Sequence, residues 1–427
     1  MHLLGRLYRR WHHVPAAADA LALAAIASIP WSTSLTSVLI VVWLIAVLPG
    51  LDWPSLRHSL ISVPGGPPVV LVGIAVVGML WADVSIAERW SGLRPFLKLL
   101  IIPVLLAQFK QSANGNRAII GFLISCIVVL GLSMSSAIWP SITWWRPGNP
   151  GVPFKNQITQ SAEFTICAFC LIPVAITAYR TGHYTRGTSL FILSALFLVD
   201  VAFVATSRSE LVVIATLITL SSVRALNWKG VPIALGLITV LSAVAWYSSP
   251  YLQGRLRHGN WEIERYITED RATSIGLRMD WWTHSLEFWK AAPLIGYGTG
   301  SIKSVFRRNT DQQTTRDPQF VTTDPHNQTI NVALQLGLIG VAALFAMWAA
   351  HFQLFRYSGL IAWFGSVVVV QNIIGSVFNS HLSNFTEGWI YVFGVGVLGG
   401  MIQRIDGRIS INGNRVTALG RQHCTCT

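Results

Sequence analysis

Twelve apolar runs, most of them long enough to cross a lipid bilayer, dominate this sequence and restrict what it can fold into. A membrane-spanning helix needs about 20 mostly apolar residues, because each residue adds about 1.5 Å along the helix axis. Within lipid, helices of this length satisfy all of their own backbone hydrogen bonds. We therefore predict an all-α, polytopic membrane bundle of about 12 transmembrane helices. The runs are 16–30, 32–49, 67–82, 93–109, 118–139, 159–179, 189–206, 209–223, 231–247, 327–349, 360–378 and 388–402.

The composition supports a membrane protein and narrows its partners. Of 427 residues, 52% are hydrophobic and 11% are charged, so membrane lipids are the expected surroundings. Lys and Arg together number 31 against 18 Asp and Glu, which is compatible with nucleic acid, anionic lipid or an anionic substrate. Because the chain is so apolar, we expect no nucleic-acid partner.

The runs predict a single membrane domain, 1–427, with one long insert. A polar stretch, 248–325, separates the ninth run from the tenth, and we expect it to form a large loop that contains short helices. Loops of this length inside compact domains are usually functional.

Lys and Arg in the short loops predict the orientation of the bundle. In a twelve-span arrangement most of them fall on one side, which places both termini in the cytoplasm and the long loop outside it. This basic set is Arg6, Arg9, Arg10, Arg57, Lys110, Arg117, Arg180, Arg186, Arg224, Lys229, Arg356, Arg404, Arg408, Arg415 and Arg421. The exceptions, which need another explanation, are Arg89, Arg94, Arg146, Lys155 and Arg208.

The sequence gives no indication of a metal or a cofactor. Of the five cysteines, Cys126, Cys167 and Cys170 lie inside apolar runs, and we expect them to be free. Cys424 and Cys426 lie in the last residues, where lipidation or an unstructured tail are both open. There is no D-x-D pair and no H-E-x-x-H motif, so a divalent metal has no obvious ligands.

The first candidate site is the short polar segment 205–210, which lies between two closely spaced apolar runs. Its Arg208 is predicted to lie at or just below the outer membrane interface. A charge at that depth usually faces a cavity or an anionic partner. A snorkelling side chain, a local pair with Glu210, or a counter-ion in Asp200 remains an alternative.

The second candidate site lies in the long loop, at 276–289. Met279, Trp282, Leu286 and Trp289 repeat at helical spacing and predict a helix whose apolar stripe lies on the membrane or on the bundle. Arg278, Trp281 and Ser285 form the neighbouring row of the same helix. Arg278 could therefore point into a cavity, or could bind a lipid phosphate or Asp280.

A glycine-rich stretch, 293–301, follows that helix. Its glycines predict a tight turn that ends the helix, and its backbone amides are candidates for binding an anion. Because it lacks the Lys-Ser/Thr ending of a nucleotide phosphate loop, ATP binding is not expected.

The third candidate site is 322–329, immediately before the tenth run. Asp324 is predicted as the N-cap of a membrane helix and Pro325 as its first residue. His326 would then lie in the first turn, where the positive end of the helix dipole favours a neutral imidazole that accepts a proton. A purely structural role for His326 is the alternative.

The order of these motifs resembles the O-antigen ligase and polymerase superfamily. The resemblance covers about 159–350. It rests on Ser207-Arg208-Ser209-Glu210, on Leu277-Arg278 with Trp281-Trp282, on Pro293 to Ser301, on Asp324-Pro325-His326-Asn327-Gln328, and on Gly337-Leu338-Ile339-Gly340.

The resemblance implies a metal-independent glycosyltransferase in the bacterial inner membrane, working at the periplasmic face. The donor would be a glycan linked to undecaprenyl pyrophosphate, and the acceptor the lipid A-core oligosaccharide. By motif, Arg208 and Arg278 would hold the pyrophosphate, and His326 would act as the base or as a positioning donor. Trp282 and Asn327 are the further candidates for substrate binding.

Two other functions stay open at the level of the sequence. A polymerase acting on the same lipid-linked donor would need the same residues. A flippase for that lipid would use the arginines as transit contacts. Transporters usually consist of two related halves with helices broken near the midplane. We find no such halves in the sequence.

Overall fold

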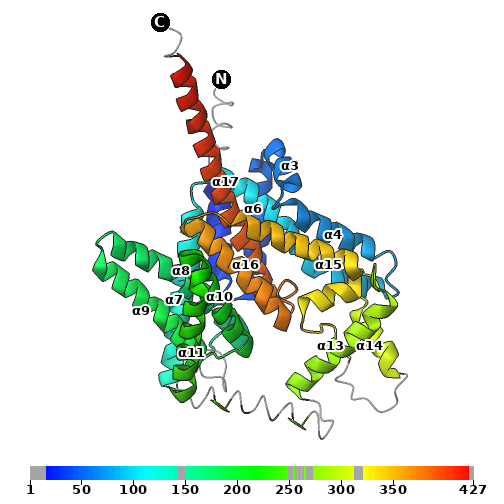
Figure 1. Cartoon of the computed structure of the whole chain (residues 1–427). Coiled ribbons are helices and arrows are strands. Elements are labelled where there is room, and N and C mark those ends of the chain that lie inside the picture. Colours follow the sequence, from blue (N-terminus) through cyan, green and yellow to red (C-terminus); the bar gives the residue numbers. More distant parts are fainter. Residues whose placement is uncertain are drawn as a thin grey trace.

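The computed structural model describes residues 16–139, 141, 151–248, 273–311 and 321–422, together with Gln253, Gly254, Arg257, Trp261, Glu264 and Arg265. In this part of the chain the fold is all-α, as predicted, and contains no β-strand (Figure 1). Arg146, Cys424, Cys426 and the first 15 residues lie outside the described residues.

The helices follow the predicted apolar runs closely. The first covers Ala16–Ser28. It is followed by α2 (Thr33–Val47), α3 (Trp53–Ile61), α4 (Gly66–Gly78), α5 (Ile86–Leu97), α6 (Ile101–Gln111), α7 (Gly115–Ile138), α8 (Gln157–Arg180), α9 (Tyr184–Phe203), α10 (Arg208–Leu226), α11 (Gly230–Ser248), α13 (Ser274–Ala291), α14 (Ile302–Asp311), α15 (Gln328–Leu354), α16 (Leu360–Phe378) and α17 (Phe385–Gln422).

The predicted count of about 12 spans is not confirmed. Among the described residues, nine helical segments are long and apolar enough to cross a membrane, or ten if the bent pair α3 and α4 forms one broken span. The axes of that pair differ by 77°. The helix Ala16–Ser28 is too short to pass the same test. The predicted runs 16–30 and 67–82 are therefore helices that do not qualify as complete spans of their own, and the runs 209–223 and 231–247 fall within one segment, Arg208–Ser248.

One of the nine segments, Arg208–Ser248, is itself folded back. Its 41 residues would extend about 60 Å as one straight helix, roughly twice the thickness of the hydrocarbon core. The chain turns at Asn227, whose φ is +55°. The helices on either side of this turn, α10 and α11, pack against each other.

The described chain begins and ends at the same end of the bundle, where α17 leaves it, and α13 and α14 lie at the opposite end (Figure 1). Near the start of the chain, Asp19 accepts hydrogen bonds from Gln108 (2.8 Å) and Asn114 (2.8 Å). We call the end of the bundle where the described chain begins and ends the terminal end. The end that carries α13 and α14 is called the loop end.

Helix α15 is broken at Gly337, where φ is +61° and ψ is −159°. The glycine-rich stretch 293–301 lies against this break. The N–H groups of Tyr297 and Gly298 donate to the carbonyls of Leu334 and Gln335, both at 2.8 Å. A broken membrane helix needs such partners, because lipid offers none for the freed backbone groups.

The same contacts correct one prediction. The glycine-rich stretch does form a tight turn, with positive φ at Gly296, Gly298 and Gly300. Its amides, however, are not available to an anion. In addition to the two bonds above, Thr299 N donates to Gly78 O (3.1 Å) and Gly300 N to the Gln335 side chain (2.7 Å). The glycines allow close approach to α15 and α4 rather than binding of an anion.

Candidate active site

His326 lies on a turn at the loop end, immediately before α15. Its φ of +54° is in the left-handed region, which non-glycine residues seldom adopt. Its N–H donates to Oδ1 of Asp324 at 3.0 Å, and the Ser380 hydroxyl donates to the same oxygen at 2.5 Å. Strained backbone held in this way is often found at functional sites.

The start of α15 differs from the prediction. The N-cap is Asn327, whose Oδ1 accepts from Ile330 N at 3.1 Å, and the helix begins at Gln328. The prediction that Asp324 caps the helix and that His326 lies in its first turn was therefore wrong. The reason is local: the Asp324 carboxylate closes its own turn by accepting the N–H two residues further along.

The imidazole ring of His326 is held from two sides. Its Nδ1 lies 2.9 Å from Oδ1 of Asn379, the residue that follows α16. Its ring packs on the indole of Trp281, with centroids 5.5 Å apart and planes inclined by 31°. Because an amide oxygen only accepts, Nδ1 carries a proton, and in the neutral ring Nε2 has the lone pair that can accept another.

Helix α13 brings Arg278 toward this turn. The helix itself confirms the one predicted at 276–289. Nε1 of Trp282 donates to the carbonyl of Pro325 at 2.9 Å, next to His326. Arg278 lies one helical turn before Trp281 and Trp282, so it belongs to the face of α13 that meets the His326 turn.

The predicted apolar stripe on α13 is partly exposed and partly packed on the bundle. Met279 and Leu286 are 43% and 51% exposed, so their edge of the stripe faces outward. Trp282 and Trp289 instead use their indole N–H groups on backbone carbonyls, Pro325 in one case and Pro293 in the other. The stripe therefore both packs on the bundle and offers apolar surface to the membrane.

Arg208 comes from another part of the fold but lies at the same end. It is the first residue of α10, half-buried, after an N-cap at Ser207. Helix α10 runs antiparallel to α16, because Arg224 near its far end donates to Ser366 near the start of α16 (3.2 Å). The beginning of α10 is therefore level with the end of α16, where Asn379 holds His326.

Asp200, the candidate counter-ion of Arg208, accepts hydrogen bonds from two neighbouring side chains. Asp200 is fully buried and accepts hydrogen bonds from Ser133 (2.5 Å) and Gln160 (3.1 Å). The interpretation of Asp200 as the partner of Arg208 stays a prediction. Glu210 is also buried, and its side chain contacts Thr165 and Gln371.

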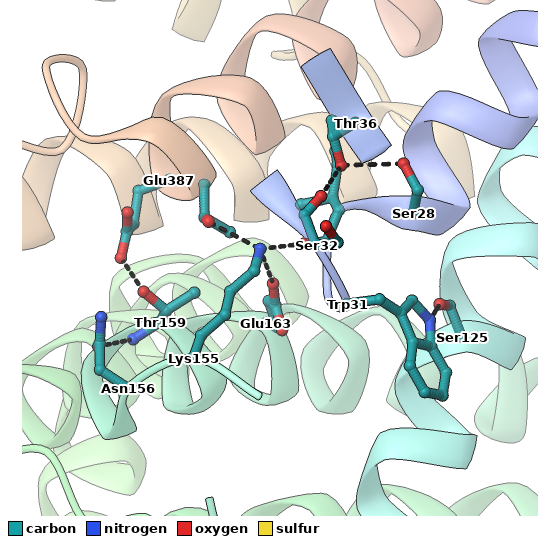
Figure 2. A network of polar contacts seen from close by, with 12 residues as sticks. Ser28, Trp31, Ser32, Thr36, Ser125, Lys155, Asn156, Thr159, Glu163 and Glu387 are labelled. Carbon is teal, nitrogen blue, oxygen red and sulfur yellow. Dashed lines mark hydrogen bonds and ion pairs between the residues drawn. The ribbon is translucent and has the colours of Figure 1, made fainter. Parts of the chain in front are cut away.

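A buried polar network between α8 and α17 was missed in the sequence analysis (Figure 2). Nζ of Lys155 donates to the Thr386 hydroxyl (2.8 Å) and to the Ile29 carbonyl, and lies 3.9 Å from Oε1 of Glu163. Thr159 donates to Oε1 of Glu387 at 2.7 Å. Glu163 inside an apolar run and Glu387 immediately before another were the available signal, since such residues are costly in lipid unless they have partners.

This network accounts for Lys155, one of the basic residues that did not fit the predicted orientation of the bundle. Burial lowers the pKa of Lys155, and the carboxylates of Glu163 and Glu387 oppose that shift. Arg89, another exception, donates to the carbonyls of Met79 (2.9 Å) and Val84 (3.0 Å). Both cations therefore serve the packing of the loop end rather than its orientation in the membrane.

The turn 379–384, which holds His326 through Asn379, is itself fixed by hydrogen bonds with neighbouring parts of the bundle. Nζ of the buried Lys98 donates to the Asn384 carbonyl at 2.6 Å. Oε1 of Gln328, at the start of α15, accepts from Leu382 N at 3.0 Å. Burial lowers the pKa of His381, against the raising effect of Glu387. These contacts join α5, α15 and α17 around the candidate site.

The cysteines and the possible metal ligands were also considered in the sequence analysis. Cys126, Cys167 and Cys170 are free, as predicted. Among the described residues, no group of three or more His, Cys, Asp or Glu side chains is arranged to hold a metal ion.

Comparison with known proteins identifies the segment that carries these residues. Residues 193–345 match the family model described as O-antigen ligase. No curated protein matches the chain. The matched segment runs from α9 into α15 and contains Arg208, Arg278 and His326. In this segment the multi-pass membrane protein is similar to the O-antigen ligase family, which supports a ligase- or polymerase-type role in O-antigen processing.

Proposed function

We propose that the protein is a ligase that transfers O-antigen polysaccharide from undecaprenyl pyrophosphate to the lipid A-core oligosaccharide, without a metal ion. The observation that carries this proposal is the fixed ring of His326 beside the helix that bears Arg278. A base and a cation on adjoining elements suit a reaction that removes a proton and releases an anion.

In the proposed step, Nε2 of His326 takes the proton from an acceptor hydroxyl. The hydroxyl oxygen then forms a bond to the anomeric carbon of the glycan. The bond between that carbon and the pyrophosphate oxygen breaks, and undecaprenyl pyrophosphate leaves with the electron pair. General bases of this kind typically contribute about 10²- to 10⁴-fold to a rate.

Arg208 and Arg278 would hold the pyrophosphate. Negative charge develops on the leaving group as the glycosidic bond breaks, and a guanidinium matches phosphate oxygens with two parallel hydrogen bonds. Trp282 would line the donor side of the site, beside Arg278. The capping bond from Ile330 and a second bond from Asn327 Nδ2 to Val377 O (3.0 Å) support a positioning role for Asn327.

We assign the loop end to the periplasm and the terminal end to the cytoplasm of a bacterial inner membrane. The support is the distribution of Lys and Arg. Arg57 lies in α3, and Arg356 follows α15. Lys110, Arg180 and Arg224 lie in the last turns of α6, α8 and α10, and we place all five at the terminal end. The insert 248–325, which contains α13 and α14, would then be the periplasmic loop.

One assay distinguishes the ligase from its rivals. Purified protein is mixed with lipid-linked glycan and lipid A-core, without ATP and with a metal chelator. A ladder of glycan on the core supports the ligase. Growth of glycan on the carrier lipid would instead identify a polymerase. Movement of unchanged lipid-linked glycan between leaflets of a vesicle would identify a flippase.

A further inference from the structure

A polar cavity lies beside the His326 turn. It has a volume of about 410 Å³ and is enclosed by α5, α14, the start of α15, and the turns 321–327 and 379–384. This size falls within the range of about 300–1,000 Å³ that is usual for small-molecule sites. Asp324, two residues from His326, lines this cavity, whereas no residue of α10 or α13 does.

The back of the cavity is a preorganised row of polar side chains. Gly300 N donates to Oε1 of Gln335 (2.7 Å), and Nε2 of Gln335 donates to Oδ1 of Asn331 (2.8 Å). Nδ2 of Asn331 in turn donates to Oδ1 of Asp324 at 3.3 Å. Both amides are only 4% exposed. Their orientation is fixed by these bonds before any ligand arrives.

Other polar groups at the cavity have hydrogen-bonding capacity left for a ligand. Within the described residues, the Ser91 hydroxyl, the Asn384 side-chain amide and the Lys303 ammonium group make no hydrogen bond. Oδ2 of Asp324 also accepts none, because its three donors all use Oδ1. These groups come from four separate segments and converge on one space. Convergence of this kind is typical of a specific binding site.

The charge of the lining disfavours an anionic ligand. Its charged residues are Glu88, Asp324 and Lys303, two carboxylates and one ammonium group, so the net charge is −1. A phosphate would be repelled. A sugar fits better, because each hydroxyl both donates and accepts, as the surrounding amides, hydroxyl and carboxylate require. The ring of Phe96 adds an apolar face.

We propose that this cavity binds the uncharged sugar of the acceptor oligosaccharide whose hydroxyl is glycosylated. This proposal rests on the proposed function. The donor pyrophosphate would lie on the α13 side of the His326 turn, with Arg278. The acceptor sugar would lie on the Asp324 side, in the cavity, with the base between them. Asp324 Oδ2, Asn384 and Ser91 would bind its hydroxyls.

The test compares two variants of the full-length protein in lipid nanodiscs. Ser91→Trp fills the cavity from α5, and Asn384→Ala removes one amide while keeping the carbonyl that Lys98 binds. Ile86→Trp is the matched control, because Ile86 is 79% exposed at the start of the same helix and does not line the cavity. Steady-state transfer is measured while acceptor and donor concentrations are varied separately.

We expect the acceptor KM to rise on the order of 10-fold in both variants, the effect of losing about one hydrogen bond or its equivalent in contact. The donor KM should stay unchanged, and Ile86→Trp should behave as the wild type. A rise in the donor KM instead would assign the cavity to the donor glycan and overturn the proposal. Unchanged acceptor and donor KM values would also overturn it.

A binding experiment separates this proposal from the proposed function. If the wild type transfers no glycan, the function fails, and the cavity is judged by thermal unfolding with a dephosphorylated, uncharged core oligosaccharide. A higher unfolding temperature in the wild type and Ile86→Trp, but not in Ser91→Trp, would support the sugar site. No shift in the wild type would contradict it.

Discussion

Nδ1 of His326 lies 2.9 Å from Oδ1 of Asn379, although 53 residues separate them in the sequence. This bond selects the tautomer of the imidazole and fixes the direction of Nε2. The neighbouring Trp281 ring restricts the tilt of the same side chain. The side chain proposed as the base is therefore oriented by one residue of α13 and by the residue that follows α16, which come together only in the folded protein.

Substitutions at these two positions should separate the base from the residue that positions it. We expect His326→Ala to abolish transfer, a loss of about 10²-fold or more. Asn379→Ala should lower kcat by a smaller factor, on the order of 10-fold, and leave the donor KM unchanged, because the base stays but loses its fixed tautomer. Asn379→Asp, which keeps an accepting oxygen, should restore most of the rate. Wild-type rates for His326→Ala would remove the proposed base.

The two proposed pyrophosphate ligands should not tolerate lysine. An ammonium group is a point charge and cannot form the paired hydrogen bonds of a guanidinium. Arg278→Ala should abolish transfer. Arg208→Lys and Arg278→Lys should each raise the donor KM, with the protein still present in the membrane. Arg94→Lys is the control, since Arg94 is exposed on α5 at the same end. An unchanged donor KM in both lysine variants would contradict the assignment.

Chelation of metals should leave the reaction intact. In the proposed site the arginines, rather than a metal ion, stabilise the leaving group. The transfer rate in a large excess of EDTA should therefore equal the rate without EDTA. The measurement is the initial rate after dialysis against the chelator. A loss of activity that Mg²⁺ or Mn²⁺ restores would show that a metal is required.

The break in α15 should tolerate no side chain at Gly337. An alanine there would adopt an unfavourable positive φ and would contact the backbone of Leu294. We expect Gly337→Ala to destabilise the protein by about 1–3 kcal/mol, measured as a lower unfolding temperature in detergent. Gly131→Ala in α7 is the matched control, because open space surrounds that position. Equal unfolding temperatures for the two variants would argue against strain at Gly337.

The Lys155 network should behave as a buried ion pair. Lys155→Met leaves the buried Glu163 without its cation, and loss of one partner of such a pair typically costs about 3–5 kcal/mol. The double variant Lys155→Met with Glu163→Gln should recover most of that stability, because no uncompensated charge remains. Thermal unfolding of both variants provides the comparison. If the double variant were no more stable than Lys155→Met, the ion pair would not be the source of the effect.

Most of the helices were predictable because their signal is local. An apolar run of spanning length specifies a membrane helix whatever lies elsewhere in the chain. The helix α13 and the tight turn at 293–301 were predicted for the same reason. The start of α15 was not, because Asp324 and Asn327 are both capable caps and only the packed turn decides between them.

The sequence by itself determined an all-helical membrane protein and its resemblance to the O-antigen ligase family, since periodicity, composition and motif order are properties of the chain. The roles of Arg208, Arg278 and His326 stay predictions. Tertiary structure decided which groups meet: Asn379 with His326, Lys155 with Thr386, and the glycine turn with the broken α15. It also decided that the amides of the glycine turn donate to protein carbonyls and side chains. In the same way it decided that Asp200 accepts hydrogen bonds from Ser133 and Gln160. Those pairings depend on distances between residues far apart in the chain, and a hydrogen bond is formed only when packing brings donor and acceptor within about 3 Å.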